Sequence, residues 1–363
     1  MAVAQGSVEE VGVNPNFWQG KRVFLTGHTG FKGGWLALWL TDLGAEVHGY
    51  SLQPPTSPNL FDVAQVSQGL ASNTIADVRD GGALAQAVRN SRPEIVLHLA
   101  AQPLVRQSYR DPVETYATNV MGLVHLLEGV RSIEGVRAMV IVTTDKCYEN
   151  DECERPFVEG DAMGGHDPYS SSKGCAELVS AAYRRSFLAA RGVRVATARA
   201  GNVIGGGDWA EDRLVPDFLR AIDNGQQLVI RSPESTRPWQ HVLDPLSGYL
   251  TLAQRLWEGG EPFDGAWNFG PSPSDAKPVQ WIVQRLCEGV PGARWRVSDA
   301  PKPHEARFLS LDNAKARERL GWTPRWSIDQ ALSHTLTWHL AWKAGGDMRA
   351  KCIEQIRAHE AAA

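Results

Sequence analysis

A glycine-rich turn between a short apolar run and a helical segment constrains the fold of this chain more than any other feature. Gly27, Gly30 and Gly33 are spaced three apart, directly after the apolar run from Val23 to Thr26. Glycines permit a positive φ and close backbone approach, and the start of the following helix attracts anions. A strand, a glycine turn and a helix in this order are typical of a unit that holds a dinucleotide pyrophosphate. The commoner spacing is Gly-x-Gly-x-x-Gly, so a tight turn without a ligand is the alternative interpretation.

Short apolar runs alternate with helix-length segments through the first part of the chain. The runs that we expect to form strands are 22–25, 46–50, 73–75, 95–99, 139–143 and 194–199. The segments that we expect to form helices between them are 33–43, 82–90, 112–129 and 169–191. Strands separated by helices imply a parallel, doubly wound sheet. We therefore predict an α/β fold of Rossmann type, in which ligands bind at the carboxyl ends of the strands.

The pattern changes after the sixth expected strand, where Gly205-Gly206-Gly207 interrupts the chain. We expect residues 1–20 to form an N-terminal lead and residues 21–200 to form the dinucleotide-binding domain. Residues 201–345 are assigned mainly to a smaller mixed α/β substrate-binding lobe, with segments that return to the sheet, and residues 346–363 to a C-terminal tail. Gly321 is expected to end one helix, and Ser327 with Gln330 to form a capping box for the next.

Composition and charge exclude several classes of protein. A formal net charge of -4 gives no electrostatic reason to expect a nucleic-acid partner. The longest apolar run near the N-terminus, Trp35 to Leu40, is far shorter than the roughly 18 residues of a membrane span. The first residues have neither the basic start nor the apolar core of a secretory signal, so we expect a cytoplasmic protein. Five scattered cysteines and histidines without ligand spacing predict neither a disulfide scaffold nor a metal site.

Tyr169 and Lys173 form the strongest candidate for chemistry. A tyrosine four residues before a lysine on a helix lies on the same face, where the ammonium favours the phenolate and lowers the phenol pKa. A phenolate beside a bound dinucleotide is the base that takes a proton from an alcohol in hydride-transfer enzymes. The pair alone is weak evidence, because many surface helices carry one. Its position downstream of the glycine turn makes a catalytic role the favoured interpretation.

The choice of cofactor depends on what the second strand lacks. An acidic residue at its end would bind the ribose hydroxyls of NAD, yet Gly49-Tyr50-Ser51-Leu52 offers none. Between Gly33 and Val78 there is also no Lys or Arg for the 2'-phosphate of NADP, and Lys32 is the nearest cation. We favour NAD. Asp77 and Val78 are placed to meet the adenine, with a plain surface loop as the alternative, and the small residues of Leu99-Ala100-Ala101 let the cofactor lie against the backbone.

Thr143-Thr144-Asp145-Lys146 ends the fifth expected strand, facing the position of Tyr169. Alone, this segment could be a solvated turn. With the glycine turn, His98 to Gln102 and the Tyr169 pair, it resembles the extended short-chain dehydrogenase/reductase superfamily, specifically its nucleotide-sugar 4,6-dehydratases. Four segments are closer still to the CDP-glucose 4,6-dehydratases, over roughly residues 15–345 in all: 28–35, 102–106, 144–148 and 237–242. The dTDP-glucose dehydratases have Asp-Glu where this chain has Asp-Lys.

The motifs and the resemblance together give three sets of candidate site residues. The catalytic set is Thr144, Asp145, Lys146, Tyr169 and Lys173. The cofactor-binding set is Gly27, Thr29, Gly30, Phe31, Lys32, Gly33, Asp77, Val78, Leu99, Ala100, Ala101, Thr118, Thr143, Tyr169, Lys173 and Arg199. The substrate-binding set is Gln102, Arg106, Asn202, Arg231, Arg237, His241, His304 and Arg307, in which the arginines suit bidentate contacts with a diphosphate.

The resemblance implies conversion of CDP-D-glucose to CDP-4-dehydro-6-deoxy-D-glucose, with NAD regenerated in each cycle. Tyr169 would take the proton of the sugar 4-hydroxyl. Lys146 would then remove the carbon 5 proton, and Asp145 would protonate the departing 6-hydroxyl. To act as a base Lys146 must be neutral, so we expect burial and the charge of Lys173 to depress its pKa from about 10.4. Otherwise Lys146 only orients Asp145 or a water molecule.

The resemblance also bears on partners and on competing functions. In relatives the helix with Tyr116 and Asn119 packs on a second subunit, so we expect a homodimer or a dimer of dimers. The product would serve deoxysugar and surface polysaccharide synthesis, such as lipopolysaccharide O-antigen. Another 4,6-dehydratase, for GDP-mannose or dTDP-glucose, or a 4-epimerase is the alternative, although an epimerase needs neither Asp145 nor Lys146. A non-catalytic NAD-binding sensor is a distant alternative, because such sensors often lack the Tyr-Lys pair.

Overall fold

The structure, a computed structural model, describes residues 12–150, 155–298 and 308–362 and contains a central parallel sheet. The order of its strands is β10-β6-β5-β4-β1-β2-β3. Their bounds are β1 Arg22–Thr26, β2 Glu46–Ser51, β3 Ser72–Ile75, β4 Ile95–His98, β5 Ala138–Val142, β6 Arg194–Ala200 and β10 Gly265–Phe269. The six strands expected from the sequence are all present, each within one residue at either end. The predicted Rossmann-type fold is confirmed.

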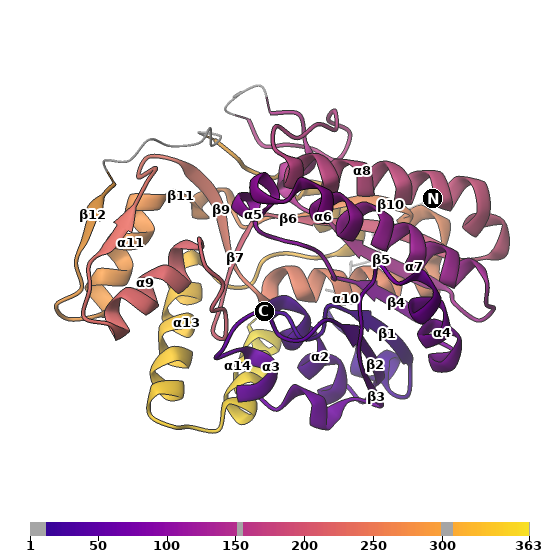
Figure 1. The fold of residues 1–363 in the computed structure, drawn as a ribbon, viewed down its shortest axis with the longest axis horizontal. Helices are drawn as coiled ribbons and strands as arrows, with labels where there is room; N and C mark the ends of the chain where they lie inside the picture. The colour runs from indigo at the N-terminus through magenta and orange to yellow at the C-terminus, as the bar shows by residue number, and fades with distance from the viewer. Residues whose placement is uncertain (1–11, 151–154, 299–307, 363) are drawn as a thin grey trace, which may run out of the picture.

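Helices cover both faces of this sheet (Figure 1). On one face, α2 (Phe31–Asp42) and α10 (Leu243–Gly259) pack on the strands, and on the other lie α4 (Gly81–Ser91), α7 (Gly122–Arg131) and α8 (Pro168–Tyr183). The segment expected as one helix at 112–129 is divided into α6 (Pro112–Tyr116), a π-helical turn and α7. The start of α8 is fixed by Asp167, whose side chain accepts a hydrogen bond from the backbone N–H of Ser170.

Two elements from the second half of the chain return to the sheet, as the sequence led us to expect. Strand β10 pairs with β6 in parallel, and its Trp267 and Phe269 are fully buried. Helix α10 packs against β5 and β6. Because β10 covers the outer edge of β6, the strand that follows α8 lies inside the sheet and not at its edge.

A smaller lobe occupies the left side of Figure 1 and packs around its own apolar cluster. Its sheets contain β7 (Asn202–Ile204), β9 (Thr236–His241) and β11 (Ala276–Pro278), and separately β8 (Leu228–Ile230) with β12 (Trp295–Val297). Its helices are α9 (Leu214–Asp223), α11 (Val279–Gly289) and α13 (Ile328–Lys343). The capping box of Ser327 and Gln330 at the start of α13 is confirmed, and Gly321 ends α12 with a φ of 67°. Short helices elsewhere are α1 (Pro15–Trp18), α3 (Leu60–Val63), α5 (Val105–Arg110) and α12 (Ala314–Leu320).

The C-terminal segment differs from the expected tail. Residues Met348–Ala361 form helix α14, which packs against α2, and the Trp39 indole donates a hydrogen bond of 2.7 Å to Glu360. Cys352 and Ile356 are fully buried there, four residues apart on one helix face. That apolar stripe is short, which is why the sequence alone did not reveal it. Over the described ranges, no helix has both the length and the apolar character to cross a bilayer.

Candidate active site

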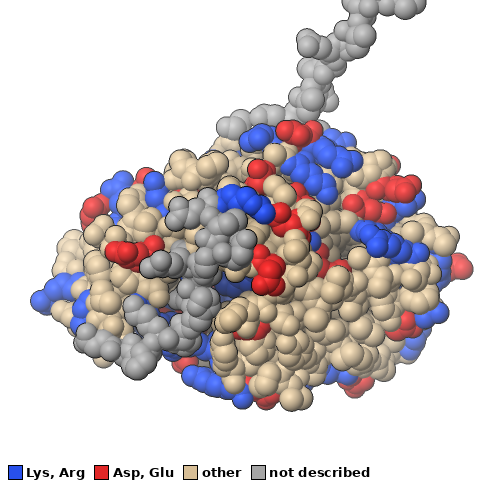
Figure 2. All heavy atoms as spheres, turned by 90° about the horizontal axis from the view of Figure 1, so that it is seen from above, with Lys and Arg blue, Asp and Glu red and all other residues tan. Residues whose placement is uncertain are grey.

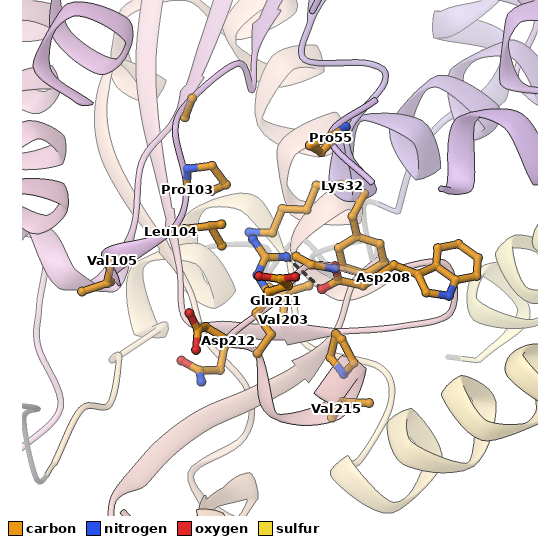
Figure 3. A pocket seen from close by; sticks show the side chains of 18 of the residues that line it. Lys32, Pro55, Pro103, Leu104, Val105, Val203, Asp208, Glu211, Asp212 and Val215 are labelled. Carbon is orange, nitrogen blue, oxygen red and sulfur yellow. Dashed lines mark hydrogen bonds and ion pairs between the residues drawn. The ribbon is translucent and has the colours of Figure 1, made fainter. Parts of the chain in front are cut away.

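A cavity of about 1370 Å³ lies between the carboxyl ends of the sheet strands and the lobe. Figure 3 shows Lys32, Pro55 and Leu104 on the sheet side, with Asp208 and Glu211 from the loop after β7 facing them. The volume exceeds the roughly 300–1,000 Å³ of most small-molecule pockets. The cavity can therefore hold two large ligands side by side.

The glycine turn forms one wall of the cavity. Gly27 has a φ of 81°, and a Cβ there would lie 2.7 Å from the backbone nitrogen of Ala100, so only glycine fits. Gly30 is the N-cap of α2 and provides no side-chain cap, which leaves the first N–H groups of the helix available to an anion. Phe31, Lys32 and Gly33 at this helix start line the cavity, as do Gly27, Thr29 and Gly30. The turn therefore fits a dinucleotide pyrophosphate.

The far end of this wall has the residues expected around the adenosine. Asp77, Val78, Leu99, Ala100, Ala101 and Thr118 all line the cavity. The Asp77 carboxylate accepts a hydrogen bond of 2.8 Å from Arg79, a cation that lies just beyond the stretch inspected in the sequence. Thr26 lies 2.7 Å from His98 and accepts hydrogen bonds from the backbone N–H groups of Leu99 and Ala100. These contacts fix the end of β4 against the glycine turn.

Tyr169 and Lys173 both line the cavity from the first turns of α8 and are largely buried. The Lys173 ammonium donates a hydrogen bond of 3.2 Å to the backbone carbonyl of Val142. Burial lowers the pKa of Lys173 to about 8, against the opposing charge of Glu177. Burial raises the pKa of Tyr169 to about 12, and the hydrogen bond with Thr144 only partly offsets it. This direction contradicts our expectation that Lys173 lowers the phenol pKa, because in this structure the ammonium is engaged by the carbonyl and the phenol is desolvated.

Asp145 and Lys146 form a pair beside Tyr169. Asp145 is fully buried, and its Oδ1 accepts a hydrogen bond of 3.0 Å from Thr144 and lies 3.5 Å from the Lys146 Nζ. Its Oδ2 has no partner among the described residues. A Cβ at Gly201 would lie 3.1 Å from that oxygen, so the glycine leaves space for the carboxylate. Thr143, Thr144 and Lys146 line the cavity, whereas Asp145 lies directly behind its wall.

The loop after β7 supplies charged residues that we did not single out in the sequence. Asp208 accepts a hydrogen bond of 2.8 Å from Arg213, and both line the cavity. Burial, followed by the nearby charge of Arg213, lowers the pKa of Lys32 to about 7. The signal was present: the glycine run at 205–207 follows a sheet strand and precedes a charged segment. We interpreted it only as a break between domains.

Four of the expected substrate-binding residues line the cavity: Arg106, Asn202, Arg231 and Arg237. Arg106 and Arg231 come from different parts of the chain and share one carboxylate. Asp212 Oδ1 lies 2.8 Å from Arg106 and 3.4 Å from Arg231. Arg237 is almost fully buried and donates to the carbonyl of Thr236. The wall of the cavity thus includes all three of these expected guanidinium groups.

Besides Asp145, three expected site residues do not line the cavity, and the corresponding predictions are corrected. His241 is fully buried between Trp35 and Trp326. Gln102 donates a hydrogen bond of 2.9 Å to Thr115, which makes it a support of the loop after β4. Arg199 points to the α8 side of the sheet, where it pairs with Glu177 at 2.9 Å, and not to the cofactor. The expected residues His304 and Arg307 lie outside the described residues.

Comparisons with known proteins agree with this geometry. The model of the family described as GDP-mannose 4,6 dehydratase matches residues 24–263. A CDP-glucose 4,6-dehydratase from Salmonella typhimurium is 53% identical over 342 residues, which are 93% of this chain and 95% of the relative. A dTDP-glucose 4,6-dehydratase from Xanthomonas campestris is 25% identical over 87% of this chain and 92% of its own length.

Solved structures share the fold. The double mutant of a dTDP-glucose 4,6-dehydratase from Streptomyces venezuelae, with NAD and a nucleotide sugar bound, superposes with a TM-score of 0.77 at 24% identity, over 90% of this chain and 99% of that one. A UDP-glucose 4-epimerase from Thermus thermophilus in complex with NAD gives 0.75 at 24% identity, over 88% and 99%. The chain therefore belongs to the nucleotide-sugar 4,6-dehydratases of the extended short-chain dehydrogenase/reductase superfamily, in the branch of CDP-glucose 4,6-dehydratase.

Proposed function

We propose that this protein is a hydro-lyase that converts CDP-glucose to CDP-4-dehydro-6-deoxy-D-glucose with NAD as its cofactor. The observation that carries the proposal is the pair of Asp145 and Lys146 at the cavity wall beside Tyr169 and Lys173. Oxidation of an alcohol needs only the tyrosine and the lysine of α8. Elimination of water also requires a further acid and a further base, and Asp145 and Lys146 after the end of β5 are placed to supply them. The similarity to a CDP-glucose 4,6-dehydratase along almost the whole chain supports the same substrate.

The NAD pyrophosphate is proposed to lie on the glycine turn, with Thr29 to Gly33 around it and Asp77 and Val78 toward the adenine. The chemistry that bound NAD would supply is acceptance of a hydride from carbon 4 of the sugar and its later return to carbon 6. The uncapped start of α2 and the absence of a Cβ at Gly27 support this placement. The similar solved structures from Streptomyces venezuelae and Thermus thermophilus also contain NAD.

Three side chains are proposed to move protons. Tyr169 accepts the proton of the 4-hydroxyl, since it lines the cavity from α8 next to Thr144. Lys146 takes the proton from carbon 5, which the 4-ketone acidifies. Asp145 donates a proton to the 6-hydroxyl as it departs as water, and its fully buried carboxyl lies directly behind the cavity wall. Thr144 holds the 4-oxygen and orients Asp145 through their 3.0 Å hydrogen bond.

The substrate diphosphate is proposed to bind Arg106, Arg231 and Arg237, with Asn202 beside them. Guanidinium groups bind phosphate oxygens in bidentate fashion, and all three of these line the cavity. In this arrangement the diphosphate competes with Asp212 for Arg106 and Arg231. The preference for cytosine rests on similarity alone.

A homodimer through α6 and α8 is proposed as the working form. Val113 on α6 and Leu178 on α8 are exposed by 77% and 62%, and Met121 lies exposed between α6 and α7. Figure 2 shows a broad area with few charged side chains in the lower right part of the face seen from above. Apolar side chains of this kind become buried in subunit interfaces.

The enzyme would act in the cytoplasm and supply deoxysugars for surface polysaccharide.

The test is to incubate the purified protein and NAD separately with CDP-glucose, dTDP-glucose, UDP-glucose and GDP-mannose. Loss of water by mass and the alkali-induced absorbance of a 4-keto sugar, with CDP-glucose alone, would support the proposal. Water loss with GDP-mannose instead would assign the substrate of the matching family model. A 4-epimer without change in mass would overturn the dehydratase assignment, and no reaction with any substrate would favour the sensor.

A further inference from the structure

A buried ion pair of Glu177 on α8 and Arg199 on β6 lies behind the catalytic wall of the cavity. We propose that Glu177, held by Arg199, is a positioning residue that fixes the catalytic helix α8 against the end of β5 and keeps Lys173 cationic. The inference rests on the proposed function, because it assigns Glu177 and Arg199 a part in the same reaction. Neither side chain lines the cavity.

The Glu177 carboxylate has four hydrogen-bond donors. Thr143 donates to Oε1 at 2.5 Å, Thr197 donates to Oε2 at 2.6 Å, and Arg199 donates one bond of 2.9 Å to each oxygen. These donors come from β6 and from Thr143, the residue directly after β5, whereas Glu177 belongs to α8. Arg199 keeps the pKa of Glu177 below its usual range despite burial. The carboxylate is thus a fixed anion that joins the helix to both strands.

The same network encloses the acid and base of the elimination step. Thr143 comes directly before the segment of Thr144 to Lys146. On the other side of that segment, Tyr148 accepts a 2.7 Å hydrogen bond from Arg199 and donates one of 2.6 Å to Asn268 on β10. Thr143 and Tyr148 both line the cavity. A shift of Glu177 would therefore act on both ends of the segment that carries Asp145 and Lys146 and would displace that segment.

Lys173 lies four residues before Glu177 on the same face of α8. The titratable groups that face or influence it are Glu177 and Tyr169 from α8, Cys147 after β5, His98 from β4 and Lys32 from α2. Burial raises the pKa of Cys147 and lowers that of His98 to about 3, so both are neutral near pH 7. Among these described groups Glu177 is the only anion, and its removal would favour neutral Lys173.

A purely structural role is the competing explanation, and stability alone does not decide against it. A buried ion pair contributes little net stability, because desolvation offsets its attraction, and replacing both partners is often tolerated. The double variant Glu177→Gln with Arg199→Met removes both charges without leaving one of them unpaired. Arg194 and Asp264 provide the matched control, since they form a 3.5 Å ion pair at the opposite end of the same strand, outside the cavity. The control variant is Arg194→Met with Asp264→Asn.

Two readouts are compared with the unmodified protein between about pH 6 and pH 10. The first is kcat against pH, and the second is the pH dependence of Lys173 acetylation measured by mass spectrometry, which needs no turnover. In the Glu177 double variant, we expect the alkaline transition of the kcat profile and that of the acetylation profile to move to lower pH by about one unit. This is a tenfold change in the ionisation constant of Lys173. KM should change little, and the control should match the unmodified protein. Transitions that stay in place in a folded Glu177 variant would overturn the proposal.

A second variant keeps the test decisive if the double variant does not fold. Glu177→Asp retains the charge but withdraws the carboxylate from one of its strands. We expect the alkaline transition to stay and kcat to fall at least about tenfold, since a misplacement of about 1 Å costs up to about 100-fold. An unchanged kcat would overturn the proposal. If the unmodified protein turns over no nucleotide sugar, the proposed function fails, while Lys173 acetylation still tests the role of Glu177.

Discussion

The two walls of the cavity are supported by opposite kinds of ion pair. Behind the catalytic wall, which carries the proposed acid-base residues, Glu177 and Arg199 are 6% and 3% exposed and satisfied by several further hydrogen bonds. On the substrate wall, Arg106 and Arg231 share Asp212 with side chains that are 29% to 40% exposed. Solvent-exposed pairs contribute little energy and are exchanged easily, whereas a buried network resists displacement. The proposed acid-base groups are therefore held by a buried network, whereas Arg106 and Arg231, two of the proposed phosphate-binding residues, are free to change partners.

The backbone shows the same contrast. Thr144 to Cys147 is a short turn with a side-chain cap, between the end of β5 and a buried tyrosine. Asp212 instead lies on a loop and has a φ of 60°, a left-handed conformation that is uncommon for residues other than glycine. Release of its carboxylate from the two arginines could relax that backbone. Substitutions on the two walls should accordingly change different kinetic constants.

The largest effect is expected on the catalytic wall, at Lys146. Lys146→Met should lower the rate of water loss at least about 100-fold, because elimination loses its base. Exchange of the carbon 5 hydrogen with deuterated solvent should be lost as well, while KM changes little. Water loss and exchange are both measured by mass spectrometry.

Lys146→Arg separates the two roles that the sequence left open for this lysine. An arginine keeps the charge beside Asp145 but cannot be neutral near pH 7. A base role predicts that the arginine variant is as inactive as the methionine variant. Recovery of more than about a tenth of the activity by the arginine would instead mean that Lys146 only orients Asp145.

Sequence reasoning succeeded where the sheet topology determines the position of a residue. The six strands, the glycine turn and the Tyr169 pair follow from local spacing, and in a parallel sheet the strand ends then converge. It failed where the direction of a side chain depends on what covers the strand. Arg199 and Thr197 alternate with Ala198 on β6 and face α8, a choice that motif spacing does not reveal.

The loop after β7 illustrates a second limit. The positions of Asp208 and Arg213 depend on a backbone path set by tertiary packing: a Cβ on Gly206 would collide with Trp338, which lies more than 130 positions later in the sequence. No local pattern encodes such a contact.

A smaller effect is expected on the substrate wall, where Arg106 and Asp212 should act in opposite directions. Arg106→Met should raise KM about tenfold through loss of one charged phosphate contact. Asp212→Asn should lower KM, because the diphosphate no longer competes with a carboxylate for two arginines. Both variants should keep kcat and should unfold within about 1 kcal/mol of the unmodified protein. Steady-state kinetics with CDP-glucose measure the two constants, and equal increases in KM for both variants would contradict the exchange of partners.

The smallest effect is expected at His241, which belongs to neither wall. The ring is fully buried, with its centroid 4.7 Å from that of Trp326 and 6.1 Å from that of Trp35. Burial keeps its pKa well below the usual range, so it stays neutral and offers no charge to a phosphate. His241→Phe preserves the aromatic packing. Of the two ring nitrogens that it removes, Nδ1 accepts a 3.3 Å hydrogen bond from the backbone N–H of Leu243, and Nε2 has no partner among the described residues. We expect kcat and KM to be unchanged and the free energy of unfolding to shift by about 1 kcal/mol or less, measured by denaturant unfolding. An increase in KM without a loss of stability would mean that His241 binds substrate after all, as the sequence predicted. It would also mean that a buried part of the molecule rearranges when substrate binds.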